Sequence, residues 1–373
     1  MRKYSSLFEI RTDLANGTLT CEKLVLYYLK NIKEKQHLNA FLEVYEEEAL
    51  AKAKEVDAKL AAGQAGKLAG MVVGLKDVLS HENHGLQAAS KILDKFVAQY
   101  NATAVQRLLD ADAIVIGRQN CDEFAMGSSN ENSSFGPVLN DADISRVPGG
   151  SSGGSAVAVQ ADLCLVSLGT DTGGSVRQPA SFCGVIGLKP TYSRISRWGL
   201  AAYASSFDCI GVLARSVEDV ALTMEVIAGA DDNDSTVSLK PVPEYTKLLN
   251  SHKKYKIAYL KEGINSDGVE EDVKNTVKQQ IEKLSAAGHT LKEVEMPLLE
   301  YALPAYYILT TAEASSNLSR YDGVKFGYRS PNTTDLASMY KKTRSEGFGK
   351  EVKKRIMLGT FVLSASYYDA YYT

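Results

Sequence analysis

The stretch RVPGGSSGGSAVAVQADLCLVSLGTDTGGSVR, from Arg146 to Arg177, carries the strongest structural and chemical signal in this chain. It contains two glycine–serine clusters, Gly149–Ser155 and Thr172–Ser175, separated by one segment of small and apolar residues. Glycine lets backbone amides approach a ligand closely, and serine hydroxyls can act as nucleophiles. Amides of the TGGS cluster can also converge on the oxyanion that such an attack creates. The stretch predicts covalent serine catalysis; for TGGS alone, a tight loop or a phosphate-binding turn is the alternative.

Strand-like and helical patterns alternate on both sides of this stretch. Leu163–Leu168 has the length and apolar character of a buried strand and leads into the second cluster. Upstream, the apolar run Leu68–Leu79 reads as a buried strand, and the segment Thr103–Asn120 reads as a helix followed by the strand Ala113–Gly117. The order of these elements predicts an α/β fold with a large mixed central sheet between layers of helices. Further elements are expected downstream: a helix over 217–230, a strand over 255–263, a helix over 269–287 and a strand over 289–297.

The first 65 residues are predicted to be a helical N-terminal arm. A helix is expected after Thr20, a good N-cap, with Leu24, Tyr27, Tyr28 and Ile32 on one face. A second, alanine-rich helix follows and ends at Gly63. No repeat or linker divides the rest of the chain, so we expect one domain over residues 66–373.

The serine needs a partner that accepts its proton, and histidine is poorly placed for that role. Gly149–Gly153 matches the G-x-S-x-G nucleophile elbow, but Pro148 interrupts the strand that the elbow requires. His252 lies in a charged segment and His289 at a predicted helix–strand junction. Lys76 ends an apolar run, and burial lowers a lysine pKa enough for the neutral amine to act as a base. The alternative for Lys76 is a surface lysine whose stem lies along apolar groups.

Composition indicates a cytoplasmic globular protein. Of 373 residues, 45% are hydrophobic and 23% charged, and the net charge of −3 provides no basic surface for binding nucleic acid directly. The five cysteines are scattered without a C-x-x-C pair, which favours reduced thiols over disulfides or zinc. No apolar run is long enough to span a membrane, and the N-terminus lacks a signal peptide. His81 and His84 lack a third ligand at a suitable spacing, so no metal site is expected.

Three of these motifs together resemble the amidase signature family. They are Lys76 in GLKD, Ser151 in PGGSSGGSA and Ser175 in GTDTGGSVR. The resemblance implies the α/β/α fold of that family and a Ser–cisSer–Lys triad. Ser175 would attack an amide carbonyl, while Ser151, after a cis peptide bond, would relay the proton to Lys76.

The resemblance also implies roles for residues around the triad. Backbone amides of Thr172, Gly173 and Gly174, with that of Ser175, would form the oxyanion hole. Asp171 and Arg177 would flank this loop and stabilise it without contacting the substrate. The remaining implied residues bind substrate: Arg355 holds a carboxylate through a bidentate pair, and Gly127 and Ser128 line the pocket.

Longer segments resemble one branch of the family, the glutaminase subunits of aspartyl/glutamyl-tRNA amidotransferases. They include NCDEFAMGSSNENSSFGPVLN, EASSNLSRYDGVKFGYR and EVKKRIMLGTFVLSASYYDAYY. Such subunits hydrolyse glutamine without a cofactor and pass ammonia to the B-subunit, which holds ATP and Mg²⁺ and makes most of the tRNA contacts; the C-subunit completes a heterotrimer. The chain lacks the family's proline near Gly70, and members continue for roughly another hundred residues, so we expect a C-terminally truncated sequence.

Two other functions fit the same motifs. One is a stand-alone amidase of small or lipid amides, for which a carboxylate-binding Arg355 would have no use. The other is a catalytically silent scaffold subunit, against which the presence of Lys76, Ser151 and Ser175 argues.

Overall fold

The computed structural model describes residues 2–249, 253–364 and 367–372. The chain divides into two compact units, one formed by Met1–Thr246 with Thr310–Thr373 and the other by Lys247–Leu309. The sequence-based division did not set the second unit apart. The predicted boundary between an arm (1–65) and a domain (66–373) lies within the first unit and stays a prediction.

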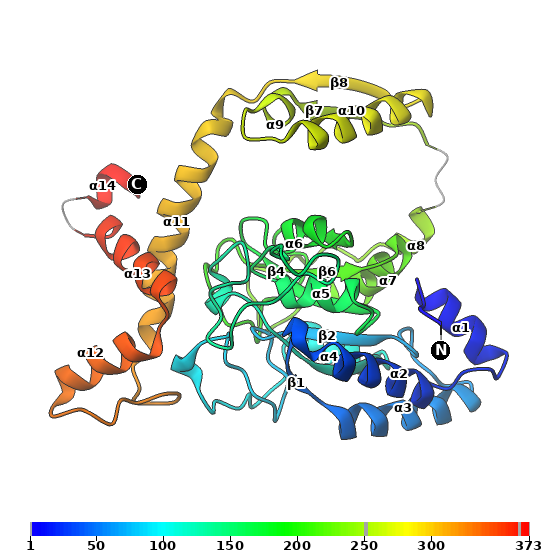
Figure 1. Cartoon of the computed structure of the whole chain (residues 1–373), viewed down its shortest axis with the longest axis horizontal. Coiled ribbons are helices and arrows are strands. Elements are labelled where there is room, and N and C mark those ends of the chain that lie inside the picture. Colours follow the sequence, from blue (N-terminus) through cyan, green and yellow to red (C-terminus); the bar gives the residue numbers. More distant parts are fainter. Residues whose placement is uncertain (1, 250–252, 365–366, 373) are drawn as a thin grey trace. The chain divides into compact units, whose positions relative to one another are not determined.

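A mixed sheet forms the centre of the first unit (Figure 1). Its strand order is β1-β3-β2-β4-β6-β5. The pairs β2–β3 and β2–β4 are parallel, whereas β1–β3, β4–β6 and β5–β6 are antiparallel. The strands are β1 (Phe41–Val44), β2 (Val72–Lys76), β3 (Ile114–Gln119), β4 (Val166–Asp171), β5 (Ile186–Leu188) and β6 (Cys209–Ala214).

Helices cover both faces of this sheet. In the sheet, β3 lies on one side of β2 and β4 lies on the other. The connection β2–α4–β3 therefore crosses the sheet in one direction and β3–α5–β4 in the opposite direction. Because such parallel connections are right-handed, α4 and α5 lie on opposite faces. Helix α5 packs on β2, β4 and β6, while α7 packs on α4 and β6. The helices that lie wholly within the first unit are α1 (Leu7–Ala15), α2 (Cys21–Glu34), α3 (Glu46–Ala61), α4 (Thr103–Asp110), α5 (Gly153–Gln160), α6 (Arg177–Phe182), α7 (Val217–Ile227), α12 (Leu336–Gly347), α13 (Lys350–Val362) and α14 (Tyr368–Tyr371). The predicted α/β/α class is confirmed.

The inner strands are buried along their whole length. Every residue of β2, β3, β4 and β6 is buried, as expected for strands covered on both faces. Strand β6 was not predicted from the sequence, yet it pairs with the full length of β4. Its six apolar and small residues follow an irregular segment rather than a recognisable turn, so periodicity alone does not separate it from a loop.

The predicted helices near the N-terminus are confirmed and show the expected ends. The Thr20 side chain caps α2 by accepting a hydrogen bond from the Lys23 amide at 3.1 Å. Leu24, Tyr28 and Ile32 of α2 are buried, and α2 runs beside α3 (Figure 1).

The second unit contains a parallel pair of strands, β7 (Lys256–Leu260) and β8 (Thr290–Val294), joined through α9 (Lys261–Asn265) and α10 (Glu271–Ala286). These strands and α10 match the strand–helix–strand order predicted for this segment. The unit boundaries fall within α8 (Tyr245–Leu248) and α11 (Ala302–Asn317). Across the described part of the chain, no helix is long and apolar enough to cross a membrane.

Candidate active site

The two glycine–serine clusters and the lysine meet at one edge of the sheet. Because β2 and β4 are parallel neighbours, their carboxyl ends lie side by side. Lys76 is the last residue of β2, and Thr172–Ser175 directly follows the last residue of β4. The first cluster leads into α5, which packs on both strands. In sheets of this kind, ligands bind at the carboxyl ends of parallel strands.

Lys76 is fully buried and contacts three hydroxyl groups. Its Nζ lies 2.7 Å from Ser151 Oγ, 3.0 Å from Ser152 Oγ and 2.8 Å from Thr170 Oγ1. Burial lowers the pKa of Lys76, while the distant charges of Asp122, Asp208 and Asp171 oppose that effect only in part. The site can therefore hold a neutral amine, which is the form that accepts a proton.

The three hydroxyls do not have equivalent roles. Ser152 donates its single hydroxyl hydrogen to the Thr170 carbonyl at 3.1 Å, so towards Lys76 it can only accept. Ser151 is fully buried, and in the described contacts its hydroxyl donates no hydrogen bond to another acceptor. It can therefore donate to a neutral Lys76. The peptide bond between Gly150 and Ser151 is cis, the arrangement that the family resemblance implies.

One backbone hydrogen bond joins the two clusters directly. The Ser152 amide donates to the Ser175 carbonyl at 3.1 Å, and the Gly150 amide donates to Gln178 Oε1 at 3.2 Å at the start of α6. Ser175 is itself buried, with 7% of its surface exposed. The two segments that the sequence analysis assigned to one site are thus in contact.

Asp171 and Arg177 hold the TGGS loop from one side. The Arg177 guanidinium forms two hydrogen bonds with the Asp171 carboxylate, each 2.9 Å long. Burial would raise the pKa of Asp171, but bonds from Arg177 and from loop amides outweigh it and keep the pKa below its ordinary value. One of those amides is Gly174 N–H, at 2.8 Å. This amide is already engaged within the loop, so the predicted oxyanion hole depends more on its neighbours.

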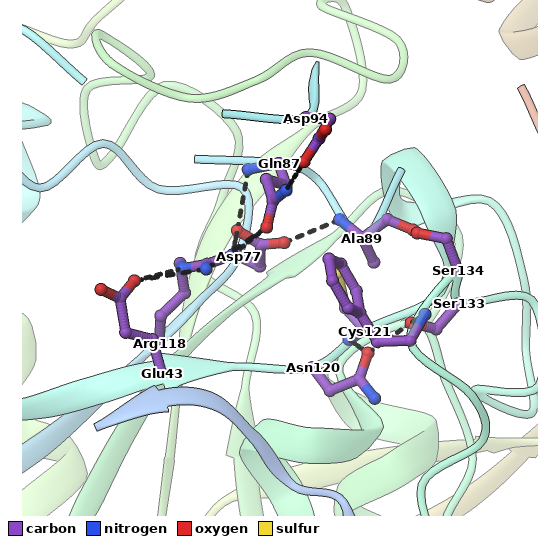
Figure 2. A network of polar contacts seen from close by, with 11 residues as sticks. Glu43, Asp77, Gln87, Ala89, Asp94, Arg118, Asn120, Cys121, Ser133 and Ser134 are labelled. Carbon is purple, nitrogen blue, oxygen red and sulfur yellow. Dashed lines mark hydrogen bonds and ion pairs between the residues drawn. The ribbon is translucent and has the colours of Figure 1, made fainter. Parts of the chain in front are cut away.

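A polar network next to Lys76 fixes the end of β2 (Figure 2). The buried Asp77 carboxylate accepts hydrogen bonds from Arg118 Nη1 at 2.6 Å and from the amides of Gln87 and Ala89 at 3.0 and 2.7 Å. Arg118 also pairs with Glu43 at 3.2 Å. Burial raises the pKa of Asp77, although Arg118 opposes this. The network ties β2 to β3, β1 and the following loop, and so restricts the backbone that carries Lys76.

Gly127 and Ser128, predicted to line the substrate pocket, lie in a loop organised by Asp122. The Asp122 carboxylate accepts hydrogen bonds from the amides of Asn130 and Asn132 at 3.0 and 3.1 Å. A Cβ at Gly127 would lie 2.2 Å from this carboxyl group, so close packing requires glycine there. Ser128 is exposed. The structure gives Gly127 a packing role and leaves the predicted substrate contact of both residues a prediction.

Arg355, the predicted carboxylate-binding residue, is 6% exposed and lies on α13. Its Nε contacts Glu351 Oε1 and its Nη1 donates to the Tyr203 hydroxyl, both at 2.9 Å. The guanidinium also lies over the Tyr203 ring, 5.5 Å from its centroid. The side chain is therefore held in a defined direction by residues of α13 and of the loop before β6.

Sequence reasoning missed Ser152, Thr170 and Asp208 as parts of the site. Ser152 carries a signal only through its position beside Ser151, and Thr170 only through side-chain alternation along β4. Asp208 lies next to the TGGS loop because Asp171 pairs with Cys209 in the β4–β6 register. No local pattern predicts such a register.

Among the described residues, the side-chain hydrogen-bond partners of Lys76 and Ser151 include no histidine. His84 Nε2 lies 2.9 Å from Glu48, and its ring stacks on that of His81. His289 accepts a hydrogen bond from the Tyr255 amide, and His252 lies outside the described residues. Within residues 2–249, 253–364 and 367–372, no group of three or more His, Cys, Asp or Glu residues could hold a metal ion.

Comparison with known proteins places this sequence among amidases. The family model described as Amidase matches residues 23–373. The glutamyl-tRNA(Gln) amidotransferase A-subunit of Chlorobaculum parvum is 54% identical over 100% of this chain and 77% of its own length. The protein of the same name from Chlorobium phaeobacteroides strain BS1 is also 54% identical, over 99% of this chain and 78% of its own length.

Solved structures agree with this relationship. The glutamyl-tRNA(Gln) amidotransferase A-subunit of Thermotoga maritima has a TM-score of 0.73 and 38% identity, covering 94% of this chain and 70% of that one. The peptide amidase of Stenotrophomonas maltophilia has a TM-score of 0.81 and 30% identity, covering 96% and 76%. With Lys76 and the two serine clusters at one sheet edge, the chain belongs to the amidase signature family.

Proposed function

We propose that this chain is a glutamine amidohydrolase that supplies ammonia to a tRNA-dependent amidotransferase. The observation that carries the proposal is the buried Lys76–Ser151 contact of 2.7 Å, next to the loop that contains Ser175. Relatives named as A-subunits of glutamyl-tRNA(Gln) amidotransferase, at 54% identity, support glutamine as the substrate. Peptide amidases share the fold, so the choice of glutamine depends on the residues around the triad.

In the proposed mechanism, Ser175 Oγ attacks the side-chain amide carbon of glutamine. Its proton passes to Ser151 while Ser151 transfers its own proton to neutral Lys76. Neutral Lys76 keeps two N–H bonds, which suit Ser152 and Thr170, and directs its lone pair to Ser151. Preorganised donors acting on the oxyanion are worth roughly 3 kcal/mol each in acyl transfer.

The tetrahedral intermediate then collapses as the carbon–nitrogen bond breaks. The proton on Lys76 returns through Ser151 to the leaving nitrogen, and ammonia is released. A water molecule then attacks the acyl ester and gives its proton through Ser151 to Lys76. As the ester bond breaks, that proton returns through Ser151 to Ser175 Oγ, and glutamate is released. We assign oxyanion binding to backbone amides among Thr172, Gly173, Gly174 and Ser175, with Asp171 and Arg177 holding the loop.

Arg355 is proposed to bind the glutamine α-carboxylate. A guanidinium suits a carboxylate because its paired N–H groups match two oxygens. Glu351 and Tyr203 fix its direction, which reduces the entropy lost when a ligand binds. Gly127 and Ser128 are proposed to line the same pocket.

We further propose the assembly and location in which the ammonia is used. The B-subunit of the amidotransferase would hold ATP and Mg²⁺ and contact the tRNA, and the C-subunit would complete a heterotrimer. The reaction would take place in the cytoplasm without a membrane or a cofactor in this chain. Residues 1–65 would form an arm on the catalytic domain of residues 66–373. The Leu7 amide, which donates to Asp219 of α7 at 3.0 Å, supports that packing.

Ammonia release from glutamine tests the proposal. Ser175→Ala should abolish release, and Arg355→Leu should raise the glutamine KM about 30-fold, because a lost charged hydrogen bond costs about 2 kcal/mol. Lys354→Gln, at the exposed neighbouring position, is the matched control and should leave KM unchanged. An Arg355→Leu variant with normal glutamine KM would contradict the carboxylate assignment, and release by Ser175→Ala would contradict the nucleophile.

A further inference from the structure

Asp208 lies between two parts of the proposed site that are far apart in sequence. It immediately precedes β6, is 3% exposed, and receives three hydrogen bonds. The Thr172 hydroxyl donates to Oδ1 at 2.7 Å. The amides of Tyr203 and Ala204 donate to Oδ2 at 2.9 and 3.1 Å. One carboxylate therefore holds both the first residue of the TGGS loop and the backbone of the Tyr203 segment.

The Tyr203 side chain continues this connection to the substrate-binding side. Its hydroxyl accepts a hydrogen bond from Arg355 Nη1 at 2.9 Å and donates to Thr310 Oγ1 at 2.8 Å. Tyr203 is 1% exposed, so its ring has little freedom to move. A continuous path thus runs from Thr172 through Asp208 and Tyr203 to Arg355, entirely within the first unit.

We propose that Asp208 is a positioning residue that sets the distance between the nucleophile loop and the guanidinium of Arg355. The inference rests on the proposed function. Glutamine must place its amide at Ser175 and its α-carboxylate at Arg355 at the same time, so the spacing of the two groups determines whether both contacts form. Errors of about 1 Å in such positioning are costly in rate, up to about 100-fold.

The chemistry of Asp208 suits this role. A carboxylate accepts several hydrogen bonds at once, and bonds to an ionised acceptor are stronger than neutral ones. Burial raises the pKa of Asp208 to about 6, although the bonds from Thr172 and the two amides oppose that rise. All three partners are donors, so these contacts suit the ionised carboxylate. In Asp208→Asn, only one side-chain oxygen can accept hydrogen bonds. The amide nitrogen that replaces the other oxygen is a donor, and it would face either Thr172 or the amides of Tyr203 and Ala204, which are donors too.

The test compares glutamine with 4-aminobutanamide, which is glutamine without the α-carboxylate. In the chain of 373 residues, Asp208→Asn should raise the glutamine KM about tenfold, the effect of weakening one charge-assisted hydrogen bond. The KM for 4-aminobutanamide should change by much less, because that amide does not need Arg355. The control is Asp219→Asn, which alters another buried carboxylate with a backbone donor, the Leu7 amide, and should leave the KM of both substrates unchanged.

Tyr203→Phe tests the other end of the path and keeps the proposal falsifiable if Asp208→Asn does not fold. It removes only the hydroxyl contacted by Arg355 and should raise the KM for glutamine more than that for 4-aminobutanamide. An unchanged glutamine KM in a folded Asp208→Asn protein, or in Tyr203→Phe, overturns the positioning role of Asp208 and leaves the proposed function in place. Absence of glutamine hydrolysis by the wild-type chain overturns the proposed function, and with it the positioning role of Asp208.

Discussion

At the scale of single residues, the unusual feature is a lysine buried among hydroxyls rather than carboxylates. A buried lysine paired with a carboxylate stays protonated, whereas Lys76 has Ser151, Ser152 and Thr170 as its nearest partners. Burial consequently lowers its pKa. The same surroundings that destabilise the charged amine make it a usable base.

Lys76→Met should lower kcat for glutamine hydrolysis by about 10²- to 10⁴-fold, the usual contribution of a general base. In the wild type, kcat/KM should rise with pH as Lys76 loses its proton, with an apparent pKa below the ordinary 10.5. That rise should be absent from the residual activity of the variant. Lys67→Met, at an exposed position, is the control. An identical pH profile in wild type and Lys76→Met would exclude Lys76 as the base.

At the scale of elements, Glu123 connects the loop that carries Gly127 to the start of α13. Its carboxylate accepts hydrogen bonds from the Gly349 amide, at 2.9 Å for Oε2 and 3.1 Å for Oε1, and from the Ser90 hydroxyl. Glu123 is 2% exposed. Burial raises its pKa to about 7, although Ser90, Gly349 and the charge of Lys353 oppose that rise. The N-cap residue of α13, the helix that carries Arg355, is therefore held by a titratable carboxyl group.

The raised pKa makes folding stability depend on pH. Between about pH 4.5, where the unfolded glutamate titrates, and about pH 7, the folded chain binds a proton that the unfolded chain does not. Wild-type stability should therefore fall as pH rises through this window, by up to about 3 kcal/mol. Glu123→Gln removes this dependence, so its stability relative to wild type should increase from pH 5 to pH 8.

Urea unfolding at several pH values measures this difference. Glu47→Gln, an exposed substitution, should follow the wild-type curve. Parallel curves for wild type and Glu123→Gln across the window would show that Glu123 titrates normally.

At the scale of the whole molecule, all five cysteines are free and buried. They are spread over the first unit, from Cys21 at the start of α2 to Cys209 at the start of β6. Burial raises the pKa of Cys164 to about 11, and the pKa values of the other thiols also lie above their ordinary value. Since the thiolate is the reactive form, the native protein should protect its thiols.

A thiol reagent such as 5,5′-dithiobis(2-nitrobenzoic acid) should react with less than about one thiol in the native chain and with all five after unfolding. In dilute denaturant, the reaction rate should follow the unfolding of the first unit, because no cysteine lies in Lys247–Leu309. A thiol that reacts fast in the native protein would show that one of these sites opens locally.

Local sequence features are enough to predict the lysine, the two serine clusters and much of the local structure. Lys76, Ser151 and Ser175 are recognisable because glycine clusters and an apolar run are local features. The cap at Thr20 and the buried strands β2 and β3 also follow from local patterns, whereas β6 does not. The tertiary structure alone decided which side chains surround them. Thr170, Ser152 and Asp208 reach the site through the pairing of β2 with β4 and of β4 with β6. Strand register depends on contacts between distant segments, which no local pattern encodes.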